Sequence, residues 1–527
     1  MKKHVFTDGT RMPSLFPSAR HIAASGKQKA AASPFPAMRF SGPPAGEQVV
    51  RPLAKPGALG QHAANAIQGA IVSHKRFAVV GGGLAGCECA LRLARAGLEV
   101  TLFEQKPAAM SAAHVSGQLA ELVCSNSLRS DETTSGIGLL KAEMRALGSE
   151  FMAAADAHRV PAGKALAVDR EAFAADMTQR IEAAEHIRRE EARITGLDDA
   201  RLQGHDVIIL ASGPMTDAAL SASLAETIGT AYCYFYDAIA PIVWTHSLDM
   251  SIVFRASRYG QEKGEEGGDY LNCPFERDEY EAFHAALMDA EKVQPHGFEK
   301  EKHFEGCMPI EALAQRGPRT LTFGPLKPVG FVDPRTGRRP WAVLQLRAES
   351  RNGEACNLVG CQTKLTYAEQ ARVFRMVPGL QRAEFARYGS MHRNTYVNAP
   401  EVLAPDLSLR ARPDVFLAGQ ITGVEGYVES AASGLWLALM LIAREQGTLL
   451  PQPPVECALG ALLNHLRTPV KHFQPSNAHF GLMPELDEKA KKKDRKALYA
   501  QRAQAAFQRW CADAAKAGCR LFPSAAF

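Results

Sequence analysis

The chain has 527 residues, 46% hydrophobic and 22% charged, so it is long enough for two or three globular units. Its formal net charge of +5 does not argue for nucleic acid, because residues 1–75 carry ten Lys/Arg and two Asp/Glu, which leaves −3 for the rest. Eleven scattered cysteines without paired metal-ligand spacing favour reduced thiols over a disulfide framework and indicate no metal site.

Residues 1–75 are predicted to be a disordered extension. They contain eight prolines and no hydrophobic periodicity that would close a core. Their basic, acid-poor composition is similar to that of a transit peptide, but a start codon assigned too far upstream would look the same, and we favour the second explanation. The folded protein is expected to begin near Lys75.

The clearest pattern follows in RFAVVGGGLAGCECALRLARAGLEVTLFEQ, residues 76–105. It predicts a strand, a glycine turn, a helix that Gly97 ends, a second strand and then an acid. Glycines let the backbone approach a pyrophosphate, the helix N-terminus faces its charge, and the acid holds a ribose. Cys87 and Cys89 fall on the helix, where packing is the better explanation than a redox pair. The predicted dinucleotide site consists of Gly81, Gly82, Gly83, Leu84, Ala85, Gly86 and Glu104.

Two later segments favour FAD over NAD. HDVIILASGP, residues 205–214, predicts a buried strand ending in a turn, and PDVFLAGQITGVEGYVESAASG, residues 413–434, predicts a strand followed by glycines that open a helix. They are similar to the further fingerprints of FAD enzymes, although plain parallel strands would also explain them. In the second segment we expect Gly419, Gly423 and Gly426 to contact the cofactor. The apolar run at 431–443 is too short to span a bilayer and predicts a buried helix.

Two other segments leave alternatives open. FEGCMPIEALAQRG, residues 304–317, places Cys307 just before a predicted helix that stops at Gly317. From the residues alone, a packed thiol has the advantage over a nucleophile. From residue 488, EKAKKKDRKALYAQRAQAAFQRW predicts a basic helical tail, for which nucleic-acid contact and a solvated surface are both open.

A family resemblance then rests on several segments in order along the chain. They include AELVCSNSLRSD (120–131), PAGKALAVDR (161–170), FEGCMPIE (304–311), FGPLKPVG (323–330), MHRNTYVNAP (391–400), GQITGVEGYVESAASG (419–434) and PSNAHFGL (475–482). Together they resemble the folate- and FAD-dependent tRNA (uracil-5-)-methyltransferase family, which is related to the GidA-type tRNA-modifying flavoproteins. The resemblance runs from about Arg76 to the basic tail, with Cys361 standing where a phenylalanine is usual.

The resemblance implies a reaction and a nucleophile. Such enzymes methylate C5 of the T-loop uridine of tRNA, at position 54, with 5,10-methylenetetrahydrofolate as carbon donor, reduced FAD, and NAD(P)H to reduce the flavin. Uracil C5 becomes nucleophilic once a thiolate adds at C6. The family pattern places that nucleophile at Cys307 and a second functional cysteine at Cys124. A free thiol titrates near ~8.5 and needs a positive neighbourhood to react at neutral pH.

Other site residues carry over from the family pattern. His392 resembles the imidazole that stacks on the pterin, and Arg393 and Asn394 would add polar contacts; a structural histidine is the alternative. A set of five cations would contact the phosphates of the tRNA. An ordinary solvated protein surface would explain these charged residues as well. This set is Arg316, Arg319, Lys327, Arg338 and Arg339. The implied partner is tRNA in the cytoplasm, with no membrane.

The predicted fold is α/β. A doubly wound Rossmann-type FAD-binding domain would comprise residues 76–231 and 401–450, with an inserted mixed α/β domain at 232–400 and a helical C-terminal segment at 451–527. Two other functions remain open, namely a small-molecule flavin oxidoreductase that turns over without tRNA and a non-catalytic tRNA-binding flavoprotein.

Overall fold

The computed structural model describes residues 75–111, 113–229, 233–260, 267–293, 308–486, 491 and 493–519. All of these belong to one unit, Gly69–Phe527. The predicted extension at 1–75 therefore lies outside the described residues, apart from Lys75.

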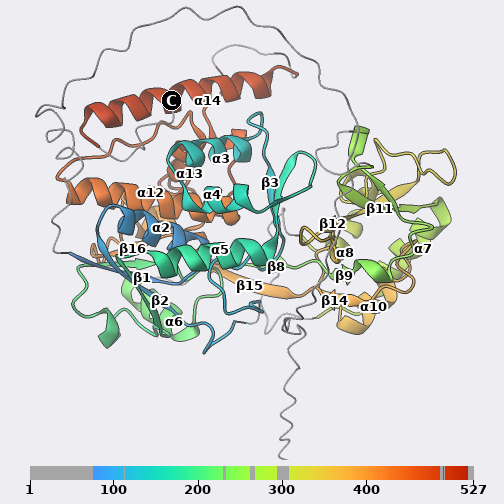
Figure 1. The fold of residues 1–527 in the computed structure, drawn as a ribbon, viewed down its shortest axis with the longest axis horizontal. Helices are drawn as coiled ribbons and strands as arrows, with labels where there is room; N and C mark the ends of the chain where they lie inside the picture. The colour runs from blue at the N-terminus through green and yellow to red at the C-terminus, as the bar shows by residue number, and fades with distance from the viewer. Residues whose placement is uncertain are drawn as a thin grey trace, which may run out of the picture. The chain divides into compact units, whose positions relative to one another are not determined.

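A parallel sheet confirms the Rossmann-type α/β prediction (Figure 1). Its five strands have the order β16-β7-β1-β2-β6, and every neighbouring pair is parallel. The strands are β1 (Arg76–Val80), β2 (Glu99–Glu104), β6 (Ile187–Glu191), β7 (Val207–Leu210) and β16 (Val415–Leu417). Strand β16 pairs with β7, so residues after 400 complete the sheet that residue 76 begins.

Two helices pack side by side, and the first of them also contacts strands of this sheet. They are α2 (Leu84–Arg95), which follows β1, and α12 (Tyr427–Glu445), which follows β16 (Figure 1). A Cβ at Gly434 would lie 2.3 Å from the carbonyl oxygen of Ala85, so the close crossing requires glycine there. Helix α12 is buried from Val428 to Ala443, which confirms the predicted buried helix. Further helices in this part are α3 (Gly136–Ala146), α4 (Glu150–Ala157), α5 (Arg170–Ala183) and α6 (Ala218–Ile228).

Two small antiparallel sheets complete this half of the fold. One has the order β3-β5-β4, and the other pairs β8 with β15. Their strands are β3 (Ser127–Ser130), β4 (Arg159–Val160), β5 (Ala165–Val168), β8 (Cys233–Ala238) and β15 (Met391–Tyr396).

A second hydrophobic core confirms the inserted mixed α/β part. Its antiparallel sheet has the order β10-β11-β12-β13-β9-β14. The strands are β9 (Ile242–Trp244), β10 (Phe254–Ala256), β11 (Tyr270–Phe275), β12 (Ala342–Ala348), β13 (Ala355–Leu358) and β14 (Phe385–Arg387). The helices are α7 (Arg277–Asp289), α8 (Ile310–Ala314), α9 (Thr320–Phe323) and α10 (Tyr367–Phe374). The predicted domain boundaries stay a prediction.

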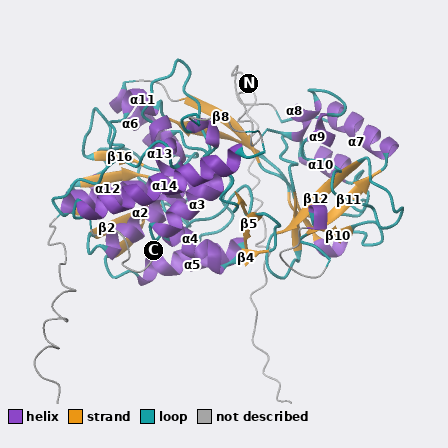
Figure 2. Cartoon of the chain, turned by 90° about the horizontal axis from the view of Figure 1, so that it is seen from above, coloured by secondary structure: helices purple, strands orange, loops and turns teal. Residues whose placement is uncertain are grey.

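The remaining helices are α11 (Ala399–Val402), α13 (Ala458–His465) and α14 (Arg495–Lys516), and α14 confirms the predicted helical tail. Helix α14 packs on α3, and Figure 2 shows the two next to each other. It buries Phe507 and Trp510 and exposes Arg495, Lys496 and Arg509. In the part of the chain that the structure describes, no helix is both long enough and apolar enough to cross a membrane.

Candidate functional site

The glycine turn between β1 and α2 leaves space beside a helix N-terminus. A Cβ built on Gly83 would meet no atom within 4 Å, whereas one on Gly86 would lie 1.9 Å from the carbonyl oxygen of Gly81. Gly86 is therefore required by the packing of the turn itself. Gly83 instead keeps open the approach to the first N–H groups of α2, where helix geometry favours an anion.

Glu104 ends β2 beside this turn. One carboxylate oxygen accepts a hydrogen bond from the backbone N–H of Gly82 at 2.7 Å, and the other accepts one from the backbone N–H of Lys106 at 2.9 Å. The side chain is buried yet lines the adjoining cleft. This contact fixes the glycine turn relative to the end of β2, as a ribose-binding acid in a dinucleotide fold requires.

A cleft runs from the glycine turn across the carboxyl ends of the parallel strands. Gly81, Gly82, Gly83, Leu84 and Ala85 line one end, residues 211–217 line its side, and Gly419 and Tyr427 close it from the α12 side. Ligands of doubly wound sheets bind at this position. The open face at Gly83 and the buried acid at Glu104 together fit a dinucleotide.

The predicted cysteine at position 124 meets Tyr427 near this cleft. The backbone N–H groups of Cys124 and Ser125 donate to the Tyr427 phenol oxygen at 2.7 and 3.2 Å. Cys124 Sγ lies 2.8 Å from the same oxygen. Because two N–H groups occupy the oxygen lone pairs, we infer that the phenol O–H donates to Sγ. Burial raises the pKa of Tyr427 well above its ordinary value, so the phenol keeps this proton.

Three buried or half-buried arginines surround Cys124. Arg347 donates to Ser125 Oγ and Asn126 Oδ1, both at 2.7 Å, and Arg387 donates to the carbonyl oxygen of Val123 at 3.0 Å. Burial would lower the pKa of Arg170, but its partner Glu349, at 2.6 Å, raises it, with Tyr427 and Cys124 adding to that effect. Positive charge beside a thiol is the environment that reactive cysteines require.

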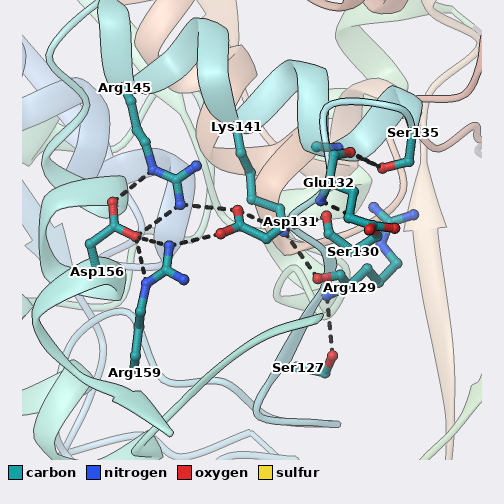
Figure 3. Close-up of polar contacts among 11 residues, drawn as sticks. Ser127, Arg129, Ser130, Asp131, Glu132, Ser135, Lys141, Arg145, Asp156 and Arg159 are labelled. Atoms are coloured by element: carbon teal, nitrogen blue, oxygen red, sulfur yellow. Dashed lines mark hydrogen bonds and ion pairs between the residues drawn. The ribbon is translucent and has the colours of Figure 1, made fainter. Parts of the chain in front are cut away.

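The segment after Cys124 is anchored by a polar network (Figure 3). Asp131 accepts hydrogen bonds from Arg145 at 3.1 Å and Arg159 at 2.8 Å, and both arginines also bind Asp156. Lys141, on α3, donates to the carbonyl oxygens of Arg129 and Ser130 at 3.0 and 2.8 Å. Because these contacts join β3, α3, α4 and β4, the thiol-bearing segment is fixed at its C-terminal end as well as at Tyr427.

The chain is similar to known proteins over most of its length. The family model "Glucose inhibited division protein A" matches residues 76–448. A protein of Nitratidesulfovibrio vulgaris, named methylenetetrahydrofolate--tRNA-(uracil-5-)-methyltransferase TrmFO, is 68% identical over 437 residues, which are 83% of this chain and 92% of that protein. The chain belongs to the TrmFO family.

A second relative agrees with this TrmFO assignment, and a solved structure agrees with the fold. A TrmFO of Geobacter sulfurreducens is 55% identical over 82% of this chain and 98% of its own length. Among solved structures, GidA of Aquifex aeolicus superimposes with a TM-score of 0.59 at 17% identity, covering 86% of this chain and 77% of that one. At that identity the likeness supports the fold alone.

The structure describes only some of the cysteines and folate-site residues that the sequence predicted. Cys307 lies outside the described residues, as do the side chains of His392 and Arg393. The backbone of His392 pairs with Asp237 in the β8–β15 sheet, and Asn394 in the same strand is buried. Cys87 and Cys89 are wholly buried, and burial raises the pKa of both thiols, which agrees with packing.

The three glycines that we expect to contact the cofactor in residues 413–434 differ in their surroundings. Gly419 lines the cleft and donates its N–H to Ser433 Oγ at 2.7 Å. A Cβ on Gly423 would lie 2.4 Å from the Phe473 ring, and one on Gly426 would lie 2.3 Å from Glu429 Oε2. Packing therefore explains Gly423 and Gly426, which are not among the described residues that line the cleft.

The five predicted phosphate-binding cations share one segment of the inserted part. Arg316 and Arg319 follow α8, which ends two residues earlier than the predicted helix, and Lys327 lies after α9. Arg338 and Arg339 follow a turn that the Asp333 N–H closes on the carbonyl oxygen of Arg338 at 2.9 Å. All but Lys327, which is half-buried, are exposed.

Sequence reasoning missed the residues that hold Cys124. Tyr427, Arg170 and Asn126 stood inside the motifs that carried the family resemblance, which was the available signal. Arg347 and Arg387 lie in strands without such a motif, so only their contacts reveal them. Within the described residues, no group of three or more His, Cys, Asp or Glu side chains could hold a metal ion.

Proposed function

We propose that this protein is a methylenetetrahydrofolate--tRNA-(uracil-5-)-methyltransferase that converts the T-loop uridine at position 54 to 5-methyluridine. The names of relatives that are 51–68% identical over most of the chain support this activity. The observation that carries it in the structure is the thiol of Cys124, held by Tyr427 at a cleft with dinucleotide geometry.

The cleft fits FAD, which would be held by the glycine turn, Glu104 and Gly419. When bound and reduced by NAD(P)H, FAD supplies the two electrons that turn a methylene unit from 5,10-methylenetetrahydrofolate into a methyl group. The N–H groups at the start of α2 would face the pyrophosphate, and Glu104 would accept from a ribose hydroxyl. For folate, His392, Arg393 and Asn394 remain our proposed contacts.

The uridine is proposed to be activated by a thiolate. Attack of Cys307 Sγ on uracil C6 forms an S–C bond and moves the C5–C6 electron pair into an enolate, which makes C5 nucleophilic. After C5 gains the one-carbon unit, loss of the C5 proton expels the thiolate and restores the ring. Cys124 is the second thiol of the site, and its contact with the Tyr427 phenol and nearby arginines suits a group that holds or moves that proton.

Substrate binding is proposed to use the cations at Arg316, Arg319, Lys327, Arg338 and Arg339. Their positive charge would contact tRNA phosphates. The target uridine must leave the T-loop stack to reach a cleft floored by the parallel sheet. We place the FAD-binding domain at 76–231 and 401–450 and the substrate domain at 232–400, and we expect the enzyme to act where tRNA is modified, in the cytoplasm.

One assay separates this function from its alternatives. Purified protein, NADPH, methylenetetrahydrofolate and unmodified tRNA are combined, and 5-methyluridine is measured by mass spectrometry. Turnover of NADPH without tRNA dependence or product would indicate a small-molecule flavin oxidoreductase. Tight tRNA binding without product would indicate a non-catalytic tRNA-binding flavoprotein.

The nucleophile is tested with T-loop RNA containing 5-fluorouracil, because fluorine at C5 cannot leave as a proton does. We expect a denaturation-resistant protein–RNA band whose crosslinked peptide contains Cys307, and a Cys307→Ala protein that keeps its flavin but forms no product. If the crosslinked peptide contains Cys124 instead, Cys124 is the nucleophile and Cys307 is the second functional thiol. A Cys307→Ala protein that still methylates, with no band from the native protein, would refute the mechanism.

A further inference from the structure

An alternating stack of aromatic rings and guanidinium groups lies on the inserted part of the chain. The Arg319 guanidinium carbon sits 5.4 Å from the ring centroid of Phe323 and 5.5 Å from that of Trp341. On the Trp341 ring, the Arg277 guanidinium carbon also lies within 5.2 Å. We call Phe323, Arg319, Trp341 and Arg277 the Phe323 stack. Cation–π attraction of this kind favours the position of the Arg319 guanidinium beside the two rings.

The outer ring of this stack faces solvent. Phe323 is 72% exposed, although its neighbours Leu321 and Thr322 in the same short helix are buried. Single exposed apolar residues need no explanation in themselves. What distinguishes Phe323 is that the guanidinium of Arg319 lies over its ring and also contacts Trp341, so that the stack ends in an exposed aromatic side chain.

The segment that carries Phe323 and Arg319 is positive, whereas the Arg277 end of the stack is acidic. On α7, Arg277 pairs with Glu281 at 2.8 Å and is flanked by Glu276, Asp278 and Glu279. Between residues 312 and 340 the chain has six cations and one acid, Asp333. That acid is 1% exposed and is paired with Arg335 at 2.7 Å. Arg338 and Arg339 lead directly to Trp341 and are both exposed. An anionic partner is therefore favoured on the Phe323 side of the stack, and an acidic phosphate chain with flat bases matches both the charge and the ring.

We propose that the Phe323 stack is a platform on which an unpaired base of the RNA substrate stacks, beside phosphate contacts from Arg338 and Arg339. This inference rests on the proposed function and names a contact for it. Every base has a π-face, so stacking on Phe323 would be tolerant of sequence and would select unpaired over duplex RNA. A loop from which one base has been extruded offers such unpaired neighbours.

A second stack of rings on the inserted part of the chain is a weaker candidate for binding an unpaired base. Tyr367, 60% exposed, stacks on Tyr388 at 5.0 Å, and Tyr388 stacks on Phe385 at 4.8 Å. The helix that begins at Tyr367 contains an ion pair between Glu369 and Arg372 at 2.5 Å, so it offers phosphates no surplus positive charge. Tyr367 therefore serves as the matched control for Phe323.

The test measures binding of an unmodified tRNA transcript by the flavin-loaded full-length protein and by Phe323→Ala, Phe323→Trp and Tyr367→Ala. We expect Phe323→Ala to weaken binding by about 10-fold, because stacking on an aromatic side chain contributes that order of affinity per base. Phe323→Trp should bind like the native protein, and so should Tyr367→Ala. All variants should keep their flavin content, melting temperature and NADPH oxidation.

Two further measurements separate stacking from charge. Phe323→Ala should leave the slope of log Kd against log salt unchanged, whereas the double variant Arg338→Ala, Arg339→Ala should reduce the slope by about one to two units. A T-arm hairpin with 2-aminopurine at one loop position at a time should lose fluorescence at one position on binding the native protein. With Phe323→Ala, that quenching should disappear.

The outcomes distinguish this inference from the proposed function. If the native protein neither binds nor methylates tRNA, both are refuted. If it methylates tRNA and Phe323→Ala binds as tightly as the native protein, or if Tyr367→Ala alone weakens binding, the platform assignment is wrong and the proposed function stands.

Discussion

The phenol oxygen of Tyr427 lies 2.8 Å from the Sγ of Cys124, 303 residues away in the sequence, and also accepts the backbone N–H of Cys124. Tyr427 begins the long buried helix α12 and also lines the cleft. A single side chain thus connects the thiol-bearing segment to the helix that closes the predicted cofactor site.

Replacement of Tyr427 by Phe should lower both stability and turnover. The N–H groups of Cys124 and Ser125 would lose their acceptor, which costs about 1–3 kcal/mol in unfolding free energy where no water replaces it. We expect a lower urea midpoint and a loss of 5-methyluridine formation larger than the loss of flavin. Tyr367→Phe, at an exposed ring, is the control and should change neither quantity. Native turnover in Tyr427→Phe would show that the phenol only supports the loop.

Two glycines of the turn should respond differently to substitution. At Gly83 the backbone has φ −78°, which any residue adopts, and a side chain would project into the cleft. Gly83→Val should therefore fold with a near-native melting temperature but purify colourless. Gly86→Ala should instead yield little folded protein, because its Cβ would lie 1.9 Å from the carbonyl oxygen of Gly81. A yellow Gly83→Val protein with full flavin content would contradict the cofactor placement.

Glu88 should make stability depend on pH. Burial raises its pKa to about 7, from 4.5 for an exposed carboxyl, although the Phe151 N–H donates to it at 2.7 Å. The folded state therefore binds the proton of Glu88 more tightly than the unfolded state does. The contribution of this proton to the unfolding free energy is complete below pH 4.5 and is lost as pH rises toward 7. Relative to Glu88→Gln, the unfolding free energy of the native protein should fall by up to about 3 kcal/mol over this range.

Urea titrations at the two ends of the range test this dependence. Glu171→Gln, on the exposed face of α5, should track the native protein at every pH. If Glu88→Gln shows the same pH dependence as the native protein, burial of Glu88 is not its source.

His392 tests the proposed folate site. If the imidazole contacts the pterin, His392→Ala should weaken productive use of methylenetetrahydrofolate while leaving NADPH oxidation by the flavin largely intact. The two half-reactions are compared at matched flavin content. If NADPH oxidation and the use of methylenetetrahydrofolate fall equally, His392 supports the structure and does not contact the folate.

Deletion of residues 1–70 should leave flavin content, melting temperature and methylation nearly unchanged, because that segment lacks a core-forming pattern. Calorimetry of the intact and shortened chains, with flavin absorbance measured on both, checks this directly. A large loss of soluble protein would show that the extension packs on the rest.

Local patterns alone determined much of this protein. The strand, glycine turn and helix at 76–95 form as predicted because glycine positions and apolar periodicity act over a few residues. The same holds for α12 and the helical tail. The helix predicted to reach Arg316 ends at Ala314 because Pro318 disfavours helical backbone before it and Gly317 adopts φ +145°.

Only the tertiary structure decided what surrounds Cys124. Tyr427, Arg347 and Arg387 reach it from α12, β12 and β14, and no local pattern encodes which distant side chains meet. Likewise, the sequence marks Gly83, Gly86, Gly423 and Gly426 alike as glycines, but the space around each separates the one that opens the cleft from those that packing requires. Sequence specifies backbone preferences over neighbouring residues, whereas burial and contact depend on segments hundreds of residues apart that fold onto one another.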